Sequence, residues 1–323
     1  MDKDGLLEAF LSDDERYADL VNGIIFEGEQ KVREEDLIRE DTRTGMWRLP
    51  EDGKGRGKRR TKNRDLLRRI LFGVNFAVIG VENQETVDYA VPLRSLSYDV
   101  YEYERQAAEI RRRVRKSRNG EGTGSGGEYL YGFLKSSRLK PVVTLILYYG
   151  KEAWDGPAQL HEMLDFTGIP EELKAWVQDY RIHLIDIGRW EGTQVFQTDV
   201  KQVFDFIRFR RDKKKLKELV LGDPAYREMA EEAYDVMAAY TGAEELMELK
   251  NSYKKGGKVD MCEALTEMLE DERNLGIKRG IARGEERFGL LAERLMEEGR
   301  TEELLQASKN RSCREKLYRE LGI

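Results

Sequence analysis

The sequence predicts an α/β protein that continues into a helical C-terminal extension. Short runs of β-branched and apolar residues, typical of strands, recur between residues 65 and 187. Segments with helical periodicity surround these runs, and beyond residue 197 one charged helical segment follows another. We therefore predict two regions, an α/β domain at 1–195 and a charged helical region at 196–323.

The composition excludes several classes of protein. Lys and Arg number 56 and Asp and Glu 62, for a net charge of -6, and charged residues reach 37% against a usual share of about 25%. The apolar runs are far shorter than the ~20 residues of a membrane helix, and the first residues form no apolar signal segment. Two cysteines and two histidines cannot build a disulfide framework or a zinc cluster. We expect a cytoplasmic protein in which any bound metal is a hard ion on oxygen ligands.

Local signals predict the N-terminal elements. Residues 4–26 have helical periodicity with a break at 12–14. At this break Ser12 is the predicted N-cap, and Glu15 completes a capping box. The segment 45–63 is rich in glycine and basic residues and predicts a mobile loop.

The centre of the chain carries the strand signals, and the end carries the helical ones. The predicted strands are 65–72, 74–84, 141–149 and 182–187. Gly73 separates the first two strands and indicates a β-hairpin, and the third strand is apolar enough to be covered on both faces. Residues 92–118 lack glycine and predict one long helix with Pro92 in its first turn, followed by a flexible connection at 120–127. The helices predicted after residue 197 are 198–220, 224–240, 259–275 and 285–322.

Three strongly basic segments make nucleic acid a candidate partner despite the acidic net charge. Each segment holds seven Lys or Arg residues and at most two acidic ones; the segments are 51–64, 104–118 and 208–217. Contacts with phosphates would release counterions and make binding depend on salt. The alternative is that each segment is a solvated loop or helix face.

The predicted hairpin brings two carboxylates together. If residue 72 lies opposite residue 75, the same register places Asp65 opposite Glu82, with Cβ atoms about 4.5–5.5 Å apart. Gln84 projects to the same side as Glu82 because side chains alternate along a strand. Two carboxylates this close favour a divalent cation between them, and Mg²⁺ suits such a site. The alternative is structural: Asp65 caps one strand, Glu82 ends the other, and Gln84 begins a turn.

The residues around this pair resemble a known family. The segments that carry the resemblance are Arg64-Asp65, the run 76–84, Pro92-Leu93-Arg94 with Tyr98, the strand 141–150 and Leu184-Ile185-Asp186-Ile187. They are similar to the Rpn family of recombination-promoting nucleases and transposase-like proteins, within the PD-(D/E)XK nuclease superfamily. The resemblance covers roughly residues 1–195. It implies a nuclease-like central mixed sheet flanked by helices, and Mg²⁺-dependent endonuclease activity on double-stranded DNA.

The resemblance also assigns roles to residues of the site. It implies that Asp65 and Glu82 are metal ligands, with the backbone carbonyl of Asn83 as a third. Gln84 stands where the superfamily usually has a lysine and would orient water or phosphate without supplying a positive charge. Arg94 would hold a phosphate bidentately. These roles describe hydrolysis of a phosphodiester by metal-activated water.

Several of these roles have alternatives that the sequence leaves open. Arg94 could instead pair with an acid such as Asp88, Tyr98 could be a core residue, and Asp186 could stabilise a strand end rather than assist a second metal. The basic residues expected along the DNA path are Lys58, Arg59, Arg60 and Lys62. The first helix could add one further acid to the site, with Asp14, Glu15 and Asp19 as the candidates.

The leading hypothesis is a Mg²⁺-dependent DNA endonuclease with a role in DNA recombination, transposition or defence against foreign DNA. A DNA-binding protein with the nuclease fold but little cleavage is the second hypothesis, and a helical protein–protein adaptor is the third. Glycines recur every fourth residue at Gly276, Gly280 and Gly284, which indicates a helix–helix contact or a hinge. Self-association through the C-terminal helices is therefore left open.

Overall fold

The computed structural model describes residues 3–48, 58–63, 65–73, 75–117, 131–242 and 244–323. The chain divides into two compact units, Met1–Cys262 and Glu263–Ile323. Whether 1–195 and 196–323 act as separate functional domains stays a prediction. None of the described helices is long and apolar enough to cross a membrane.

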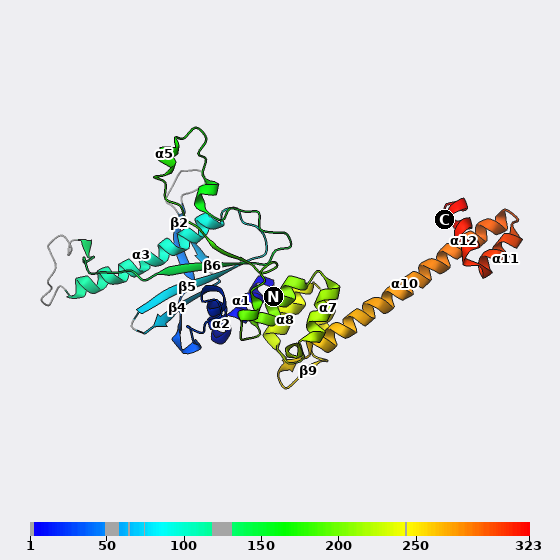
Figure 1. The fold of residues 1–323 in the computed structure, drawn as a ribbon, viewed down its shortest axis with the longest axis horizontal. Coiled ribbons are helices and arrows are strands. Elements are labelled where there is room, and N and C mark those ends of the chain that lie inside the picture. The colour runs from blue at the N-terminus through cyan, green and yellow to red at the C-terminus, as the bar shows by residue number, and fades with distance from the viewer. Residues whose placement is uncertain (1–2, 49–57, 64, 74, 118–130, 243) are drawn as a thin grey trace. The chain divides into compact units, whose positions relative to one another are not determined.

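A five-stranded mixed sheet forms the centre of the first unit (Figure 1). In spatial order its strands are β1 (Leu37–Arg39), β4 (Leu66–Phe72), β5 (Asn75–Gln84), β6 (Val142–Tyr148) and β7 (His183–Asp186). The pairs β1–β4 and β4–β5 are antiparallel, whereas β5–β6 and β6–β7 are parallel. The predicted α/β fold class with a central mixed sheet is confirmed.

The hairpin predicted around Gly73 forms in the predicted register. Phe72 lies opposite Asn75, and the pairing continues to Leu66 opposite Val81. Gly73 has a φ of +62°, a conformation that glycine adopts without the steric cost of a side chain. The register therefore directs residues 65 and 82 toward the same end of the two strands.

One face of the sheet is covered by α3 (Val91–Ser117), which connects the parallel strands β5 and β6 (Figure 1). The predicted long helix is thus present, with Pro92 in its first turn. Tyr103 of α3 packs on Leu67, Val78 and Val142 of three neighbouring strands. This helix therefore lies over the face of the sheet to which Glu82 projects.

The opposite face is covered by α1 (Lys3–Leu11) and α2 (Asp14–Ile25). Tyr17 of α2 is fully buried and donates a hydrogen bond to the backbone carbonyl of Ile79 in β5, at 2.7 Å. The predicted break between the two helices is present, but the predicted cap is wrong by one residue. Asp13 caps α2 by accepting from the backbone N–H of Arg16 at 3.1 Å, whereas the Ser12 hydroxyl donates to a carbonyl of the preceding helix.

The loop predicted for 45–63 is wrong over its whole described part, residues 45–48 and 58–63. Strands β2 (Arg43–Arg48) and β3 (Lys58–Asn63) pair antiparallel as a separate two-stranded sheet. Pairing satisfies the backbone groups that face the partner strand, so the ladder forms despite a composition that is typical of loops. Residues 49–57 and the predicted flexible connection 120–127 lie outside the described residues.

The remaining elements of the first unit are short. They are η1 (Glu34–Asp36), η2 (Leu160–Met163), α5 (Glu171–Lys174), η3 (Thr193–Val195), α6 (Val200–Phe209), α7 (Lys213–Gly222), η4 (Pro224–Arg227), α8 (Glu231–Thr241) and α9 (Glu244–Leu249). The single helix predicted at 198–220 is wrong: Asp212 accepts from the backbone N–H of Lys215 and begins a second helix there. A small sheet that was not predicted has the order β8 (Met229–Ala230), β10 (Lys258–Val259), β9 (Lys254–Lys255).

Helix α10 (Met261–Glu297) continues without a break through the glycine repeat, so the predicted end at 275 and restart at 285 are wrong. Its C-terminal part packs with α11 (Thr301–Lys309) and α12 (Arg311–Leu321). The core of this second unit is formed by Leu291, Leu295, Ala307, Leu317 and Tyr318.

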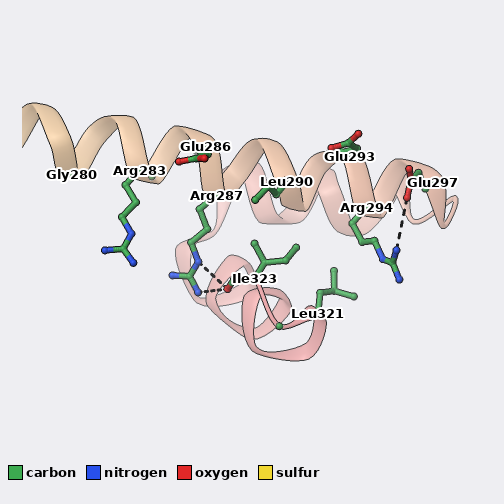
Figure 2. A pocket seen from close by; sticks show the side chains of 12 residues that line it. Gly280, Arg283, Glu286, Arg287, Leu290, Glu293, Arg294, Glu297, Leu321 and Ile323 are labelled. Carbon is green, nitrogen blue, oxygen red and sulfur yellow. Dashed lines mark hydrogen bonds and ion pairs between the residues drawn. The ribbon is translucent and has the colours of Figure 1, made fainter.

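A groove of about 1130 Å³ runs along α10 in this second unit (Figure 2). Arg287 donates hydrogen bonds of 2.6 and 3.0 Å to the backbone carbonyl of Ile323 and stacks on Tyr318. Figure 2 shows this arginine on the side of α10 that faces the C-terminal segment, with Glu286 and Glu293 on the other side. Arg287 thus fixes the carbonyl of Ile323 against α10.

Candidate functional site

Asp65 and Glu82 meet at the end of the β4–β5 hairpin. Asp65 directly precedes β4, and its Oδ2 accepts a hydrogen bond from the backbone N–H of Asn83, at 2.6 Å. The adjacent pair is Leu66 opposite Val81, so the register places Asp65 beside Glu82. The structure therefore brings together the two carboxylates that the sequence predicts as metal ligands.

Glu82 is almost completely buried, with 6% of its surface exposed. Its Oε1 lies 3.3 Å from a guanidinium nitrogen of Arg94 and 3.5 Å from the hydroxyl of Tyr98, both on α3. Tyr98 is itself buried, so it both belongs to the core and contacts the site. Burial of a carboxylate is costly unless positive charge and hydrogen bonds compensate it, and α3 supplies both.

Arg94 joins two acids. Besides its contact with Glu82, the guanidinium forms an ion pair with Asp88 in the turn before α3. The ion pair with Asp88, which the sequence leaves open as an alternative, is therefore present. Phosphate binding by Arg94 stays a prediction, which requires the guanidinium to leave at least one of these carboxylates.

Burial and charge act against each other at Asp65. Burial raises the pKa of Asp65, and the opposing effects of the Asn83 backbone N–H, of Arg94 and of the Asn83 side chain do not cancel this rise. Arg94 pairs with Glu82 and Asp88 and also lies close enough to Asp65 for its charge to lower the pKa of that carboxyl. Two adjacent carboxylates suit a divalent cation such as Mg²⁺.

The site remains sparse as a metal site. No three or more carboxylate, imidazole or thiol groups form a candidate metal cluster within the part of the chain that the structure describes. An ion at Asp65 and Glu82 would therefore complete its coordination with backbone carbonyls, water or substrate oxygens. This ligand set is ordinary for Mg²⁺, which retains several waters in most proteins.

Gln84 ends β5 in a row of polar side chains across three strands. It lies opposite Tyr148 of β6, which lies opposite Asp186 of β7. Gln84 is partly exposed and shares a face with Glu82 by strand alternation. Burial, followed by the charge of Asp186, raises the pKa of Tyr148. The carboxylate of Asp186 is 3.1 Å from the guanidinium of Arg189, which supports its structural role at the strand end.

The acids of α2 are engaged elsewhere or exposed. Asp14 pairs with Arg68 at 3.0 Å and with Arg39 at 3.2 Å. Asp19 is buried and accepts hydrogen bonds from the segment that precedes α6. Glu15 is exposed on α2. None of these three residues has a contact with Asp65 or Glu82 among the described interactions.

The predicted DNA-contacting residues lie on a strand rather than on a loop. Lys58, Arg59, Arg60 and Lys62 belong to β3, where their backbone pairs with Arg48, Trp47, Met46 and Thr44 of β2. Strand β2 in turn contacts α3. This hairpin therefore lies beside the helix that carries Arg94.

Part of the third basic segment has a structural task. Arg210 donates hydrogen bonds to the backbone carbonyls of Tyr149 (2.6 Å) and Gly150 (3.4 Å), directly after β6, and burial lowers its pKa. Arg208 pairs with Glu191 at 2.7 Å. The solvated-face alternative fails for Arg210, because its side chain supports the backbone at the end of a central strand.

Two contacts near the site were not predicted from the sequence. Lys3 of α1 pairs at 3.1 Å with Glu85, the residue after Gln84. The contact between Arg94 and Glu82 was also not predicted. Spacing along the helix shows that Arg94 is in its first turn, but only the packing of α3 on the sheet shows which acid it reaches.

Part of the chain matches a known family. Residues 76–221 match the family model described as "Putative transposase, YhgA-like", which confirms the resemblance predicted from the sequence. The matched segment contains Glu82, Gln84, Arg94 and Asp186 and begins after Asp65. Comparison with curated proteins and with solved structures gives no significant match.

Proposed function

Because residues 76–221 match the family model of YhgA-like putative transposases, we propose that the chain is a Mg²⁺-dependent endonuclease that hydrolyses phosphodiester bonds of double-stranded DNA. Its role would lie in DNA recombination, transposition or defence against foreign DNA. One observation carries the proposal most directly. The carboxylates of Asp65 and Glu82 lie side by side at the end of a hairpin, and burial raises the pKa of Asp65 despite the nearby guanidinium of Arg94.

In this proposal each residue of the site has one task. Asp65, Glu82 and the backbone carbonyl of Asn83 would hold the ion, and a divalent cation bound there would supply polarisation of the phosphate and a lower pKa for an attacking water. Gln84 hydrogen-bonds that water or a phosphate oxygen. Arg94 pairs with Glu82 and Asp88 in the structure and would turn from one of them to hold a phosphate oxygen.

A second candidate function rests on the same contacts. The Arg94–Glu82 ion pair already compensates one predicted ligand, and Gln84 lacks the positive charge of the usual lysine. These two features favour a protein that keeps the nuclease fold and binds DNA with little cleavage. Cleavage measurements separate the two functions.

The test uses supercoiled plasmid, purified full-length protein, and either Mg²⁺ or EDTA. Wild-type protein should nick the plasmid only with Mg²⁺, and Glu82→Gln should abolish nicking because it removes the ligand charge while keeping the volume. Glu85→Gln is the matched control, because it neutralises an acid three residues away and should keep wild-type rates.

Circular dichroism should show the same fold for both variants. Wild-type rates from Glu82→Gln would refute the metal site. Salt-sensitive DNA binding by a wild-type protein that never nicks would select the second function.

A further inference from the structure

The C-terminal half of α3 carries four exposed basic side chains, Arg111, Arg112, Arg115 and Lys116. No ion pair joins any of these four to another described residue. Arg105 and Arg113 on the same helix differ, because they pair with Glu102 (2.8 Å) and Glu109 (3.6 Å). The four side chains therefore add positive charge to one stretch of the surface.

This basic group lies on the same side of α3 as Arg94. With 3.6 residues per turn, Arg94 and Arg112 are separated by about five full turns and share one face of the helix. Arg115 and Lys116 lie within about 60° of Arg112 around the helix, and Arg111 lies about 100° from it, at the edge of that side. Buried residues such as Asp99 and Gln106 lie on the sheet-facing side instead. The helix thus presents a line that begins at the candidate site and ends in the basic group.

The length of the helix sets a distance along this line. A rise of 1.5 Å per residue places the basic group about 26–33 Å from Arg94. Duplex DNA rises about 3.4 Å per base pair along each strand, so this distance corresponds to roughly 8–10 base pairs. The exposed acid between the two ends is Glu104, and the central Arg105 is neutralised by its own ion pairs.

We propose that Arg111, Arg112, Arg115 and Lys116 bind the phosphate backbone of duplex DNA about 8–10 base pairs from the phosphate held at Asp65 and Glu82. The position of the cut within a longer duplex rests on the proposed function, whereas binding of the backbone does not. The helix acts as a spacer, and a DNA arm shorter than this distance loses the contact. The partner fits by charge, because each basic side chain can neutralise a phosphate and release its counterion.

The experiment measures the affinity of full-length protein for a 24-base-pair duplex in EDTA, by fluorescence anisotropy over a range of salt concentrations. The test variant replaces Arg111, Arg112, Arg115 and Lys116 together by Gln, which keeps helix propensity and removes four charges. It should flatten the slope of log affinity against log salt by up to about 3.6, or about 0.9 per lost phosphate contact. The control variant replaces Arg273, Lys278, Arg279 and Arg283, four exposed basic residues of α10, by Gln and should keep the wild-type slope.

A second arm tests the distance. Once a wild-type cut site is mapped, duplexes are shortened one base pair at a time on each side of that site. Wild-type cleavage should fall when one arm becomes shorter than about 8 base pairs, whereas the test variant should be insensitive to that arm.

The outcomes separate this inference from the proposed function. An unchanged slope in the test variant, or an equal change in the control variant, overturns the basic site even if the protein cleaves DNA. Tighter binding to an RNA duplex of the same length also overturns it. A flattened slope in a protein that never cleaves supports the basic site and refutes the endonuclease.

Discussion

At the scale of single residues, the site combines burial with negative charge at a cost to the fold. Burial raises the pKa of Asp65. The ionised carboxylate of Asp65 is therefore less stable in the folded protein than in the unfolded chain. Above the raised pKa the folded state carries this cost in full. Below the ordinary aspartate pKa of about 3.9, the carboxyl is protonated in both states and the cost disappears.

Asp65→Asn should therefore raise the melting temperature at neutral pH in EDTA, because the amide keeps an acceptor for the Asn83 N–H and removes the buried charge. The gain should shrink as the pH falls through the raised pKa and vanish below pH of about 4. Thermal unfolding between pH 3.5 and 8 measures this. Asp271→Asn, at an exposed position of α10, should show no such pH-dependent gain. A melting temperature lowered at neutral pH would show that the carboxylate stabilises the fold.

Gln84 carries a second prediction at this scale. Gln84→Leu should remove one positioned hydrogen bond and lower the cleavage rate by about 10²-fold without loss of Mg²⁺ affinity. Gln84→Lys restores the usual superfamily residue and should retain activity, although its ammonium group can weaken metal binding by repulsion. Plasmid cleavage titrated with Mg²⁺ tests both variants. Equal cleavage by Gln84→Leu at every Mg²⁺ concentration would mean that this side chain does not act at the site.

The central part of the site could be predicted because it depends on one turn. Gly73 fixes the hairpin register, and the register alone places Asp65 beside Glu82. The neighbours contributed by α3 could not be predicted in the same way. Whether Arg94 reaches Asp88, Glu82 or both depends on how the helix lies on the sheet, which no local spacing encodes.

At the scale of elements, local composition gave wrong predictions where strand pairing or helix length determined the structure. The segment around β2 and β3 has the composition of a loop, yet the two strands pair through the backbone groups that face each other. The glycine repeat of α10 similarly predicted an interruption. Each glycine costs a helix only up to about 1 kcal/mol, so a helix as long as Met261–Glu297 continues through them.

Replacing Gly276, Gly280 and Gly284 by Ala should stabilise α10. A Cβ at any of the three positions meets no described atom within 4 Å, so each alanine should contribute up to about 1 kcal/mol of helix stability. Far-ultraviolet circular dichroism and thermal unfolding measure the gain. Ala282→Gly should produce a loss of similar size at a single exposed site. Destabilisation by the alanines would instead reveal a close helix–helix contact at the glycines.

At the scale of the whole molecule, α2 connects the sheet with the helices that follow residue 195. The carboxylate of Asp19 accepts from the backbone N–H groups of Gln197 and Thr198 and from the Thr198 hydroxyl, at 2.6–3.0 Å. Arg16 pairs with Asp199 at 2.7 Å. These contacts join the N-terminal helices to α6, and the first compact unit accordingly extends to Cys262.

Asp19→Ala should lower the free energy of unfolding by about 2–4 kcal/mol, because buried donors lose their acceptor. Urea unfolding of the full chain measures the change. Glu15→Ala, on an exposed position of the same helix, should change the stability by less than about 0.5 kcal/mol. A loss of less than about 1 kcal/mol for Asp19→Ala would mean that water replaces the carboxylate without cost.

The central sheet ends on both sides in short strands, β1 with three residues and β7 with four. An unpaired edge strand is a template to which a strand of another molecule can add, and such addition leads to aggregation. Edge strands this short offer an incoming strand few backbone groups. At β1 the side chain of Arg39 also forms an ion pair with Asp14. The apolar strands β5 and β6 lie inside the sheet, between these short edge strands. We expect them to be protected from fibril-like stacking when the protein is concentrated.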